Sequence, residues 1–321
     1  MLNKTMQSVV LKLLYLVASL KYPKIEKDYR YFIRDNYFCR INQTKYLFRD
    51  YIKKDKYKVI SYKGEFDQEL RYVIPFAYWH YLNGTLKKTI SCRNTKELYF
   101  FSDNHEERFE ERDWEFSYSN YEFPNMTHSN SFSFSKWKRV PYKQHFKNDV
   151  FVYEKPLLVI SNKFNIEWDS APLNFLGIED LEKIISLYRS KYQIVYNRPL
   201  PTQIITDNSE TLDLNEYSWL RENHPEVLLV NDLYEQHRSI VNNFNHLQLM
   251  VYSNCNHFIS MHGGTAALAS CFGGVNFILS KGNPKEVHLN EFSTIFPALS
   301  GARIIHASST DSLFEQLEKV L

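Results

Sequence analysis

The feature that most constrains the fold of this chain is a series of short apolar runs, separated by amphipathic segments, in its C-terminal half. The runs are mostly apolar and do not alternate regularly with polar residues, which is typical of strands buried on both faces of a parallel sheet. The intervening segments carry apolar residues at helical spacing. The C-terminal half is therefore predicted to be a doubly wound α/β domain.

This pattern places the elements along the chain. In the C-terminal half, strands are predicted at residues 157–162, 192–196, 202–206, 227–230, 257–261, 275–279 and 302–306, and helices at 178–190, 214–223, 240–254, 265–272 and 311–321. The N-terminal half repeats the theme less regularly, with predicted strands at 57–62, 89–92 and 98–101 and a helix at 69–83. Residues 103–150 are polar, aromatic and rich in Ser and Asn, and are expected to form long loops with a few short elements.

The length of 321 residues is enough for two domains of ordinary size. We expect an amphipathic helical segment at residues 1–50, a smaller Rossmann-like domain with long loops at 51–153, and a second Rossmann-like domain at 154–321. The formal net charge of +2 is too balanced for a protein that binds nucleic acid by neutralising phosphates. The four cysteines show no metal-binding spacing, which predicts core positions and a reducing, cytoplasmic compartment.

The N-terminal segment has an apolar stretch at residues 9–20, but Lys12 interrupts it. A membrane-spanning helix needs about 20 apolar residues, and the stretch lacks the small-residue cleavage site of a signal peptide. An amphipathic helix remains, with Lys4, Lys12, Lys21 and Lys24 as its basic groups. Two interpretations stay open: the helix packs against the body of the protein, or residues 4–24 dock on an anionic membrane surface.

The sharpest local motif is SMHGGTAAL at residues 260–268, where a predicted strand runs into a Gly-Gly turn and a helix. Glycines let the backbone approach a ligand closely. The first turn of a helix leaves N–H groups without intrahelical acceptors and adds partial positive charge. The motif therefore predicts a phosphate or diphosphate site, although a tight turn without a ligand would look similar. Its residues are Ser260, His262, Gly263, Gly264 and Thr265.

Further polar residues follow the predicted strands and are expected at the same edge of the sheet, where open α/β sheets bind ligands. They are Asn162, Lys163, Arg198, Asn231 and Glu286. Lys163 and Arg198 could balance phosphate charge, and Glu286 could hold ribose hydroxyls. Each residue alone could equally be an ordinary surface residue.

The N-terminal half has a counterpart, in which a strand is followed by the Lys63-Gly64 turn and three carboxylates. Acidic residues near a helix N-terminus can serve only to complement the helix dipole. A carboxylate that faces a cleft could instead take a proton from a hydroxyl as general base. We expect Asp67 to have this role, with Glu65 and then Glu69 as alternatives, and Lys63 and Gly64 to line the acceptor side.

Several motifs are absent from the sequence. It contains no P-loop, no GxGxxG and no GxSxG, which argues against a kinase or ATPase, a dehydrogenase and a hydrolase respectively. It also contains no Asp-x-Asp motif and no His/Cys/Asp spacing typical of a metal site. We therefore expect no cofactor and no essential metal.

The residues of three segments resemble bacterial glycosyltransferases of GT-B architecture, particularly those of capsule and lipopolysaccharide biosynthesis. The segments are KGEFDQEL at residues 63–70, SNKFNIEW at 161–168 and HLQLMVYSNCNHFISMHGGTAALASCFGG at 246–274. The resemblance covers roughly residues 56–310. It implies two Rossmann-like domains that face each other across a cleft, a nucleotide-sugar donor bound by the C-terminal domain, and an acceptor and base on the N-terminal domain. The acidic ribose-binding motif of many retaining members is not matched, since Glu286 and Glu291 have a different spacing, so retention and inversion both stay open.

Three functions are compatible with this sequence. The first is transfer of a hexosyl, pentosyl or related group from a nucleotide sugar to a surface glycan or lipid-linked glycan, in the cytoplasm or on the inner face of the membrane. The second is pyruvyl transfer from phosphoenolpyruvate on the same architecture. The third is a non-catalytic module that binds a nucleotide or glycan.

Overall fold

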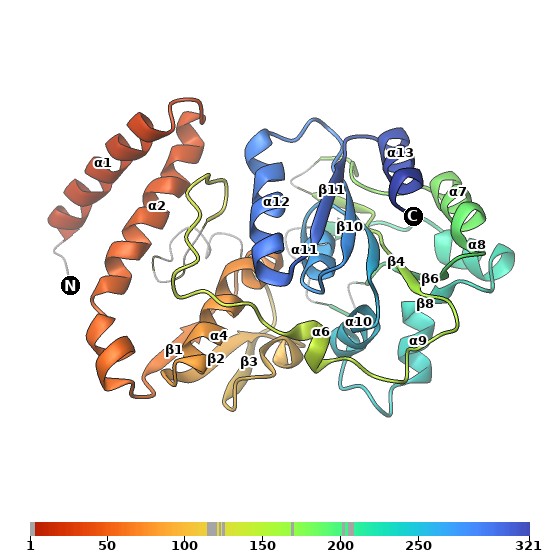
Figure 1. Ribbon diagram of the computed structural model, residues 1–321, viewed down its shortest axis with the longest axis horizontal. Coiled ribbons are helices and arrows are strands. Elements are labelled where there is room, and N and C mark those ends of the chain that lie inside the picture. The colour runs from red at the N-terminus through yellow and green to blue at the C-terminus, as the bar shows by residue number, and fades with distance from the viewer. Residues whose placement is uncertain are drawn as a thin grey trace.

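The computed structural model describes residues 4–113, 121, 123, 126–167, 170–200, 203–204 and 209–321. It contains two parallel sheets that follow one another along the chain (Figure 1). The first has the strand order β1-β2-β3, and the second has the order β11-β10-β9-β4-β6-β8. The predicted α/β class, with a parallel sheet in each half, is confirmed.

The six-stranded sheet is built from β4 (Leu157–Ser161), β6 (Gln193–Asn197), β8 (Leu228–Leu229), β9 (His257–Met261), β10 (Val275–Leu279) and β11 (Arg303–Ala307). Its helices are α7 (Ile178–Tyr188), α8 (Glu216–Asn223), α9 (Val230–Gln236), α10 (Phe244–Ser253), α11 (Gly264–Ser270), α12 (Glu286–Ser300) and α13 (Thr310–Val320). From β4 the chain builds outward through β6 and β8, and then returns to build β9, β10 and β11 on the other side of β4. The neighbours β4 and β9 therefore form the topological switch point, beside whose carboxyl ends open α/β sheets bind ligands.

Both faces of this sheet are buried, as the mostly apolar runs predict. On β4, Leu158 and Ile160 belong to a core beneath α7 and α13, whereas Leu157 and Val159 belong to a second core on the opposite face. The second core continues into the N-terminal half and includes residues such as Ile60. The two halves therefore share one apolar core. The domain boundary between residues 153 and 154 remains a prediction.

The three-stranded sheet comprises β1 (Lys58–Ser61), β2 (Leu86–Cys92) and β3 (His105–Phe109). After β1 comes one helical segment composed of α3 (Phe66–Gln68), the π-turn η2 (Glu69–Val73) and α4 (Ile74–Leu82). The helix predicted at 69–83 is confirmed. It ends at Asn83 and Gly84, and Gly84 has a φ of +76°, as a left-handed helix terminus requires.

One predicted strand was wrong, and the long helix α12 was not predicted. Residues 98–101 do not form a strand, because η3 (Lys96–Tyr99) is a 3₁₀ turn whose apolar side chains enter the core. The segment after it contains the strand β3, and α12 occupies a stretch for which no helix was predicted. The strand predicted at 202–206 lies largely outside the described residues. Short additional elements are α6 (Tyr142–His145) and the antiparallel ribbon of β5 (Asn165–Glu167) and β7 (Ser209–Thr211).

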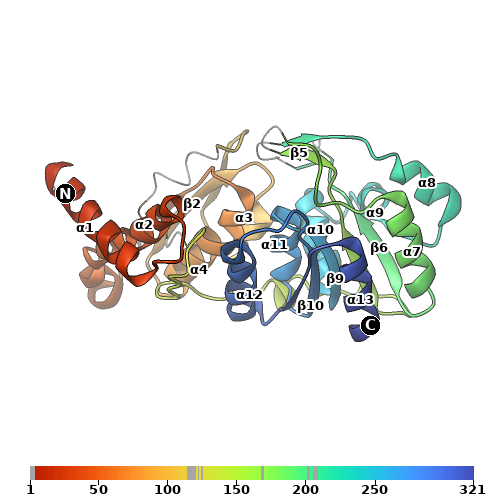
Figure 2. The same ribbon diagram turned by 90° about the horizontal axis from the view of Figure 1, so that it is seen from above.

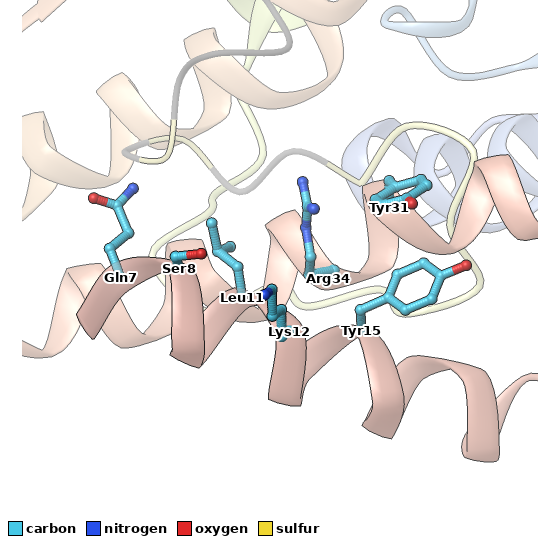
Figure 3. Close-up of a pocket in the computed structure, with 7 residues that line it drawn as sticks. All are labelled: Gln7, Ser8, Leu11, Lys12, Tyr15, Tyr31 and Arg34. Carbon is cyan, nitrogen blue, oxygen red and sulfur yellow. The ribbon is translucent and has the colours of Figure 1, made fainter. Parts of the chain in front are cut away.

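The chain begins with a hairpin of α1 (Lys4–Lys21) and α2 (Lys27–Thr44), followed by the π-turn η1 (Phe48–Lys53). The hairpin lies at one end of the molecule, with α1 outermost (Figures 1 and 2). The helix α2 contacts the body, where Cys39 Sγ donates to the Phe123 carbonyl over 2.8 Å. A cavity of about 730 Å³ lies between α1 and α2 (Figure 3). Within the described parts of the chain, no helix has both the length and the apolar character needed to cross a bilayer.

Candidate active site

The Gly-Gly turn lies at the switch point of the six-stranded sheet, directly after β9. Gly263 has φ +112° and ψ −147°, a conformation that is essentially restricted to glycine. His262, Gly263, Gly264 and Thr265 are all partly exposed, so packed side chains do not cover the turn. The start of α11 is thus open to a ligand at the edge where the sheet topology predicts one.

Two side chains from other segments approach this turn. A Cβ placed on Gly263 would lie 3.5 Å from the ammonium of Lys163, which follows the neighbouring strand β4. A Cβ placed on Gly264 would lie 3.5 Å from Cδ1 of Phe66, the first residue of α3. Figure 2 shows α3 beside α11. The turn therefore faces a cation from its own half and the acidic segment of the N-terminal half.

His262 is uncharged at neutral pH. Burial lowers its pKa to about 3, and the nearby cation of Lys163 lowers it further, followed by His306, Arg71 and His288. Its Nδ1 lies 3.0 Å from the Ser280 hydroxyl. Burial also lowers the pKa values of His306 and His288, and Arg71 is paired with two carboxylates, so Lys163 is the neighbouring cation that favours an anionic ligand here.

Asp67 lies in a buried ionic chain that joins the two halves. Its Oδ2 pairs with Arg71, and Arg71 Nη1 lies 2.5 Å from Glu291 Oε2 on α12. Glu291 Oε1 accepts from the backbone N–H of His128. Although burial opposes ionisation, Arg71 and then His128 hold the pKa of Glu291 at about 2. Burial raises the pKa of Asp67; Arg71 opposes this effect and the charge of Glu291 adds to it.

The remaining oxygen of Asp67 is a candidate reactive atom. Asp67 Oδ1 is buried and has no hydrogen-bond partner among the described residues. Most buried polar atoms in folded proteins are hydrogen-bonded. A buried carboxylate oxygen without a partner, at the place where the two halves meet, suggests that a bound ligand supplies the missing hydrogen bond. A raised pKa also suits a carboxylate that takes up a proton at neutral pH better than an ordinary Asp does.

The other acidic candidates have different surroundings. Glu65 immediately precedes α3 and is partly exposed, and its carboxylate accepts from Gln68. Glu69 is fully buried, where it accepts from Ser91 and Tyr99 and pairs with Arg112 over 2.8 Å. These donors occupy both Glu69 oxygens inside the N-terminal half, so the geometry supports Asp67 and Glu65 over Glu69.

The predicted acceptor loop is held to a neighbouring segment. Lys63 Nζ lies 2.9 Å from Asp113, and the Gly64 carbonyl accepts from Arg112 over 2.7 Å. Lys63 is partly exposed and Gly64 is buried.

Three of the predicted donor residues make internal contacts instead of facing a ligand. Asn162 is fully buried and bonds to both the carbonyl and the N–H of Leu176. Ser260 donates to Asn276 over 2.7 Å inside the sheet. Arg198 is 3% exposed and forms a two-point ion pair with fully buried Glu216.

Two further residues of the predicted donor site are Thr265 and Glu286. Thr265 Oγ1 donates to the Met261 carbonyl over 2.6 Å within the turn. Glu286 is exposed as the first residue of α12.

Asn231 lines a second cavity of about 640 Å³ beyond β8, within the usual size range of ligand pockets. Aromatic and amide side chains contribute to its wall, including Asn94 from the N-terminal half, Tyr217, Tyr234, Asn243 and Phe244. Its charges are paired, with Arg221 to Asp232 at 2.7 Å and Arg238 to Glu235 at 2.6 Å. Asn231 Oδ1 is buried and lacks a hydrogen-bond partner among the described residues.

The sequence analysis did not identify Arg71 or Glu291 as part of the site. For Arg71 a signal was present, because it follows Asp67 at the i,i+4 spacing of helical ion pairs. For Glu291 there was none, because its partner is 220 residues away in the sequence. Across the described ranges, no group of three or more His, Cys, Asp or Glu side chains is arranged to hold a metal ion.

The sequence matches no protein-family model, and no curated protein matches it. Among solved structures, the chain is similar to the E. coli heptosyltransferase WaaC with ADP, with a TM-score of 0.40, 11% sequence identity, and coverage of 87% of this chain and 78% of that chain. It is also similar to the catalytic domain of Starch Synthase IV from Arabidopsis thaliana bound to ADP and acarbose, with a TM-score of 0.30, 13% identity, and coverage of 92% and 70%. Both likenesses are distant, so function has to be inferred from the site itself.

Proposed function

We propose that this protein is a glycosyltransferase that moves a sugar from a nucleotide-sugar donor to a glycan acceptor without an essential metal. One observation carries the proposal. A glycine turn with the Lys163 ammonium close to Gly263 comes from one half, and a partly buried carboxylate, Asp67, whose buried Oδ1 has no hydrogen-bond partner among the described residues, comes from the other. The contact of Phe66 with Gly264 places the segments that carry these groups side by side.

The donor diphosphate would lie on the turn, held by the N–H groups of Gly264 and Thr265 and by the Lys163 ammonium. Such fixed donors stabilise the charge that develops on a diphosphate leaving group. Neutral His262 would contribute a hydrogen bond without adding a charge, and Glu286 is a candidate partner for ribose hydroxyls.

The cavity around Asn231 would hold the donor nucleoside. A nucleoside is uncharged, with an aromatic face and amide-like edges, and the cavity offers aromatic rings, amides and paired charges. Three strand spacings separate β9 from β8, which is roughly 14 Å and suits an extended nucleoside diphosphate.

The acceptor would approach from the N-terminal side, next to Lys63, Gly64 and Glu65. Asp67 would take the proton of the acceptor hydroxyl as that oxygen bonds to the anomeric carbon. The bond from the anomeric carbon to the diphosphate oxygen breaks, and the nucleoside diphosphate leaves with the electron pair. Arg71 would orient Asp67 by holding its other oxygen.

The proposed acceptor is a surface glycan or a lipid-linked glycan, and the proposed location is the cytoplasm at the inner face of the membrane. The four cysteines are buried and none forms a disulfide, which is typical of a reducing compartment.

Thermal-shift measurements with nucleotide sugars, CMP-sugars and phosphoenolpyruvate would test the function. A nucleotide sugar should stabilise the protein, and Asp67→Asn should lower transfer at least about 100-fold without changing donor affinity. Asp103→Asn, at an exposed carboxylate of the same half, is the matched control and should retain activity. Unchanged turnover in Asp67→Asn would remove Asp67 from the mechanism. Stabilisation by phosphoenolpyruvate alone would favour pyruvyl transfer, and donor binding without transfer or hydrolysis would favour a binding module.

A further inference from the structure

The outer face of α1 is an exposed apolar surface. Six side chains that are each about half exposed or more form it, with exposed fractions from 48% to 74%: Met6, Val9, Leu13, Leu16, Val17 and Leu20. At 3.6 residues per turn, these positions fall within an arc of roughly 100°. We propose that this face, which we call the α1 stripe, docks on an anionic lipid bilayer.

The opposite side of α1 is already used. Ala18 is fully buried, and the Tyr15 ring packs on Tyr31 of α2 with centroids 4.6 Å apart. The cavity between the two helices also lies away from the stripe, with Lys12 and Arg34 among its lining residues (Figure 3). Because α2 occupies one side of α1, the apolar residues of the other side remain without a protein partner.

A second apolar cluster lies at the same end of the molecule (Figures 1 and 2). Around η1, four side chains are between 48% and 72% exposed: Leu47, Phe48, Tyr51 and Ile52. Soluble proteins rarely expose contiguous apolar patches of this kind unless the patches bind something. The stripe and this cluster together give one end of the molecule two apolar contact points.

The charges beside the two apolar clusters indicate the kind of partner that binds there. Lys12 and Lys21 of α1 are exposed and, at helical spacing, lie on either side of the stripe, and residues 4–21 contain no acidic residue. Further exposed lysines flank both apolar clusters: Lys24, Lys45, Lys53, Lys54 and Lys56. Apolar side chains inserted at the acyl boundary, with lysines among the headgroups, are the pattern by which amphipathic helices bind anionic membranes. A second copy of the same face would instead bring like charges together.

This surface lies apart from the candidate active site, and its binding to lipid does not depend on the proposed glycosyl transfer. If that function also holds, the surface would bring the enzyme to a lipid-linked acceptor. Vesicle binding can be measured without a nucleotide, and donor binding without vesicles, so failure of one proposal is distinguishable from failure of the other.

The test is co-sedimentation of the full chain with vesicles of phosphatidylglycerol and phosphatidylethanolamine, compared with vesicles of phosphatidylcholine. Partitioning should be at least about tenfold greater on the anionic vesicles and should weaken as salt is raised. Leu13→Glu with Leu16→Glu should reduce partitioning at least about tenfold. Leu187→Glu, at an exposed position of α7, is the matched control and should bind like the unmodified chain.

Thermal unfolding of each variant checks that the fold is intact. If the fold of the double variant is disturbed, Leu20→Glu alone, at the most exposed position of the stripe, tests the same surface. The proposal is overturned if the chain does not sediment with anionic vesicles, or if stripe variants bind as well as the control. It is also overturned if light scattering finds a dimer that Leu13→Glu dissociates, since a second copy would then cover the stripe.

Discussion

The ion pair between Arg71 and Glu291 allows a quantitative prediction about stability. The pKa of Glu291 is about 2, against an ordinary value of 4.5. At 1.36 kcal/mol per pH unit, this displacement corresponds to about 3 kcal/mol in favour of the folded state at neutral pH. Loss of one partner of a buried ion pair typically costs 3–5 kcal/mol. Since Arg71 keeps Asp67 as a partner, we expect Glu291→Gln to lower the free energy of unfolding by about 3 kcal/mol near pH 7.

The sign of the pH dependence follows from the depressed pKa. A carboxylate whose pKa is lower in the folded state stabilises that state fully above pH 4.5, and this stabilisation is lost as the pH falls toward about 2. The stability difference between the native chain and Glu291→Gln should therefore be largest near neutral pH and shrink in acid. Urea unfolding at several pH values measures it, because subtracting the two curves cancels the contribution of carboxyl groups that do not interact with Glu291. Glu315→Gln, at an exposed site on α13, is the control and should change stability by less than about 0.5 kcal/mol.

The same variant has a kinetic signature. Since the charge of Glu291 raises the pKa of Asp67, removing that charge should lower the apparent pKa of the base in the profile of kcat/KM against pH. A variant that is as stable as the native chain near pH 7, or a stability difference that does not change with pH, would refute the structural role given to this pair.

Three further substitutions test the site. Gly263→Ala should cost roughly 1–3 kcal/mol of stability, because alanine is strained at φ +112°, and should weaken donor binding measured by calorimetry. Gly84→Ala, with a φ of +76° and open space around it, should cost about 1 kcal/mol and leave donor binding unchanged. Arg198→Met should lower the free energy of unfolding by about 3–5 kcal/mol, because it leaves the buried Glu216 carboxylate without its cationic partner. The donor affinity of the folded variant should not change. A large loss of affinity would show that Arg198 belongs to the donor site. Lys163→Met should weaken nucleoside diphosphate binding about tenfold. Lys191→Met, at an exposed lysine far from the turn, is the control and should not weaken it. Equal affinities of the two variants would show that Lys163 does not contact the phosphates.

The sequence predicted most of the six-stranded sheet because its signals are local. The strands at 257–261 and 275–279 were placed with the bounds that the structure gives them, since each is a short, mostly apolar run with glycine or polar residues on either side. The position of the Gly-Gly turn followed from the strand before it. Apolar runs elsewhere were ambiguous: residues 98–101 bury their side chains as a strand would, but do so from a turn.

The rest of the site depends on contacts between segments that are remote in sequence. The helix α12 carries Pro297 in its interior and has no side-chain cap at its start, so the signal for its beginning is missing and only Gly301 marks its end. Arg198 was expected at the ligand-binding edge because spacing alone does not reveal that it forms a buried ion pair with Glu216. The linked ion pairs from Asp67 through Arg71 to Glu291 join residues of both halves, so they are complete only when the two halves are packed together.

The ion pair between Arg71 and Glu291 crosses the domain boundary predicted near residue 153. Because Asp67 and Arg71 belong to one half and Glu291 to the other, cutting the chain there would separate Glu291 from Arg71 and leave each fragment with an open apolar surface. Neither fragment should be soluble alone, and the two should recover a native spectrum only when produced together. A fragment that folded unaided would show that the shared core contributes less than its burial implies.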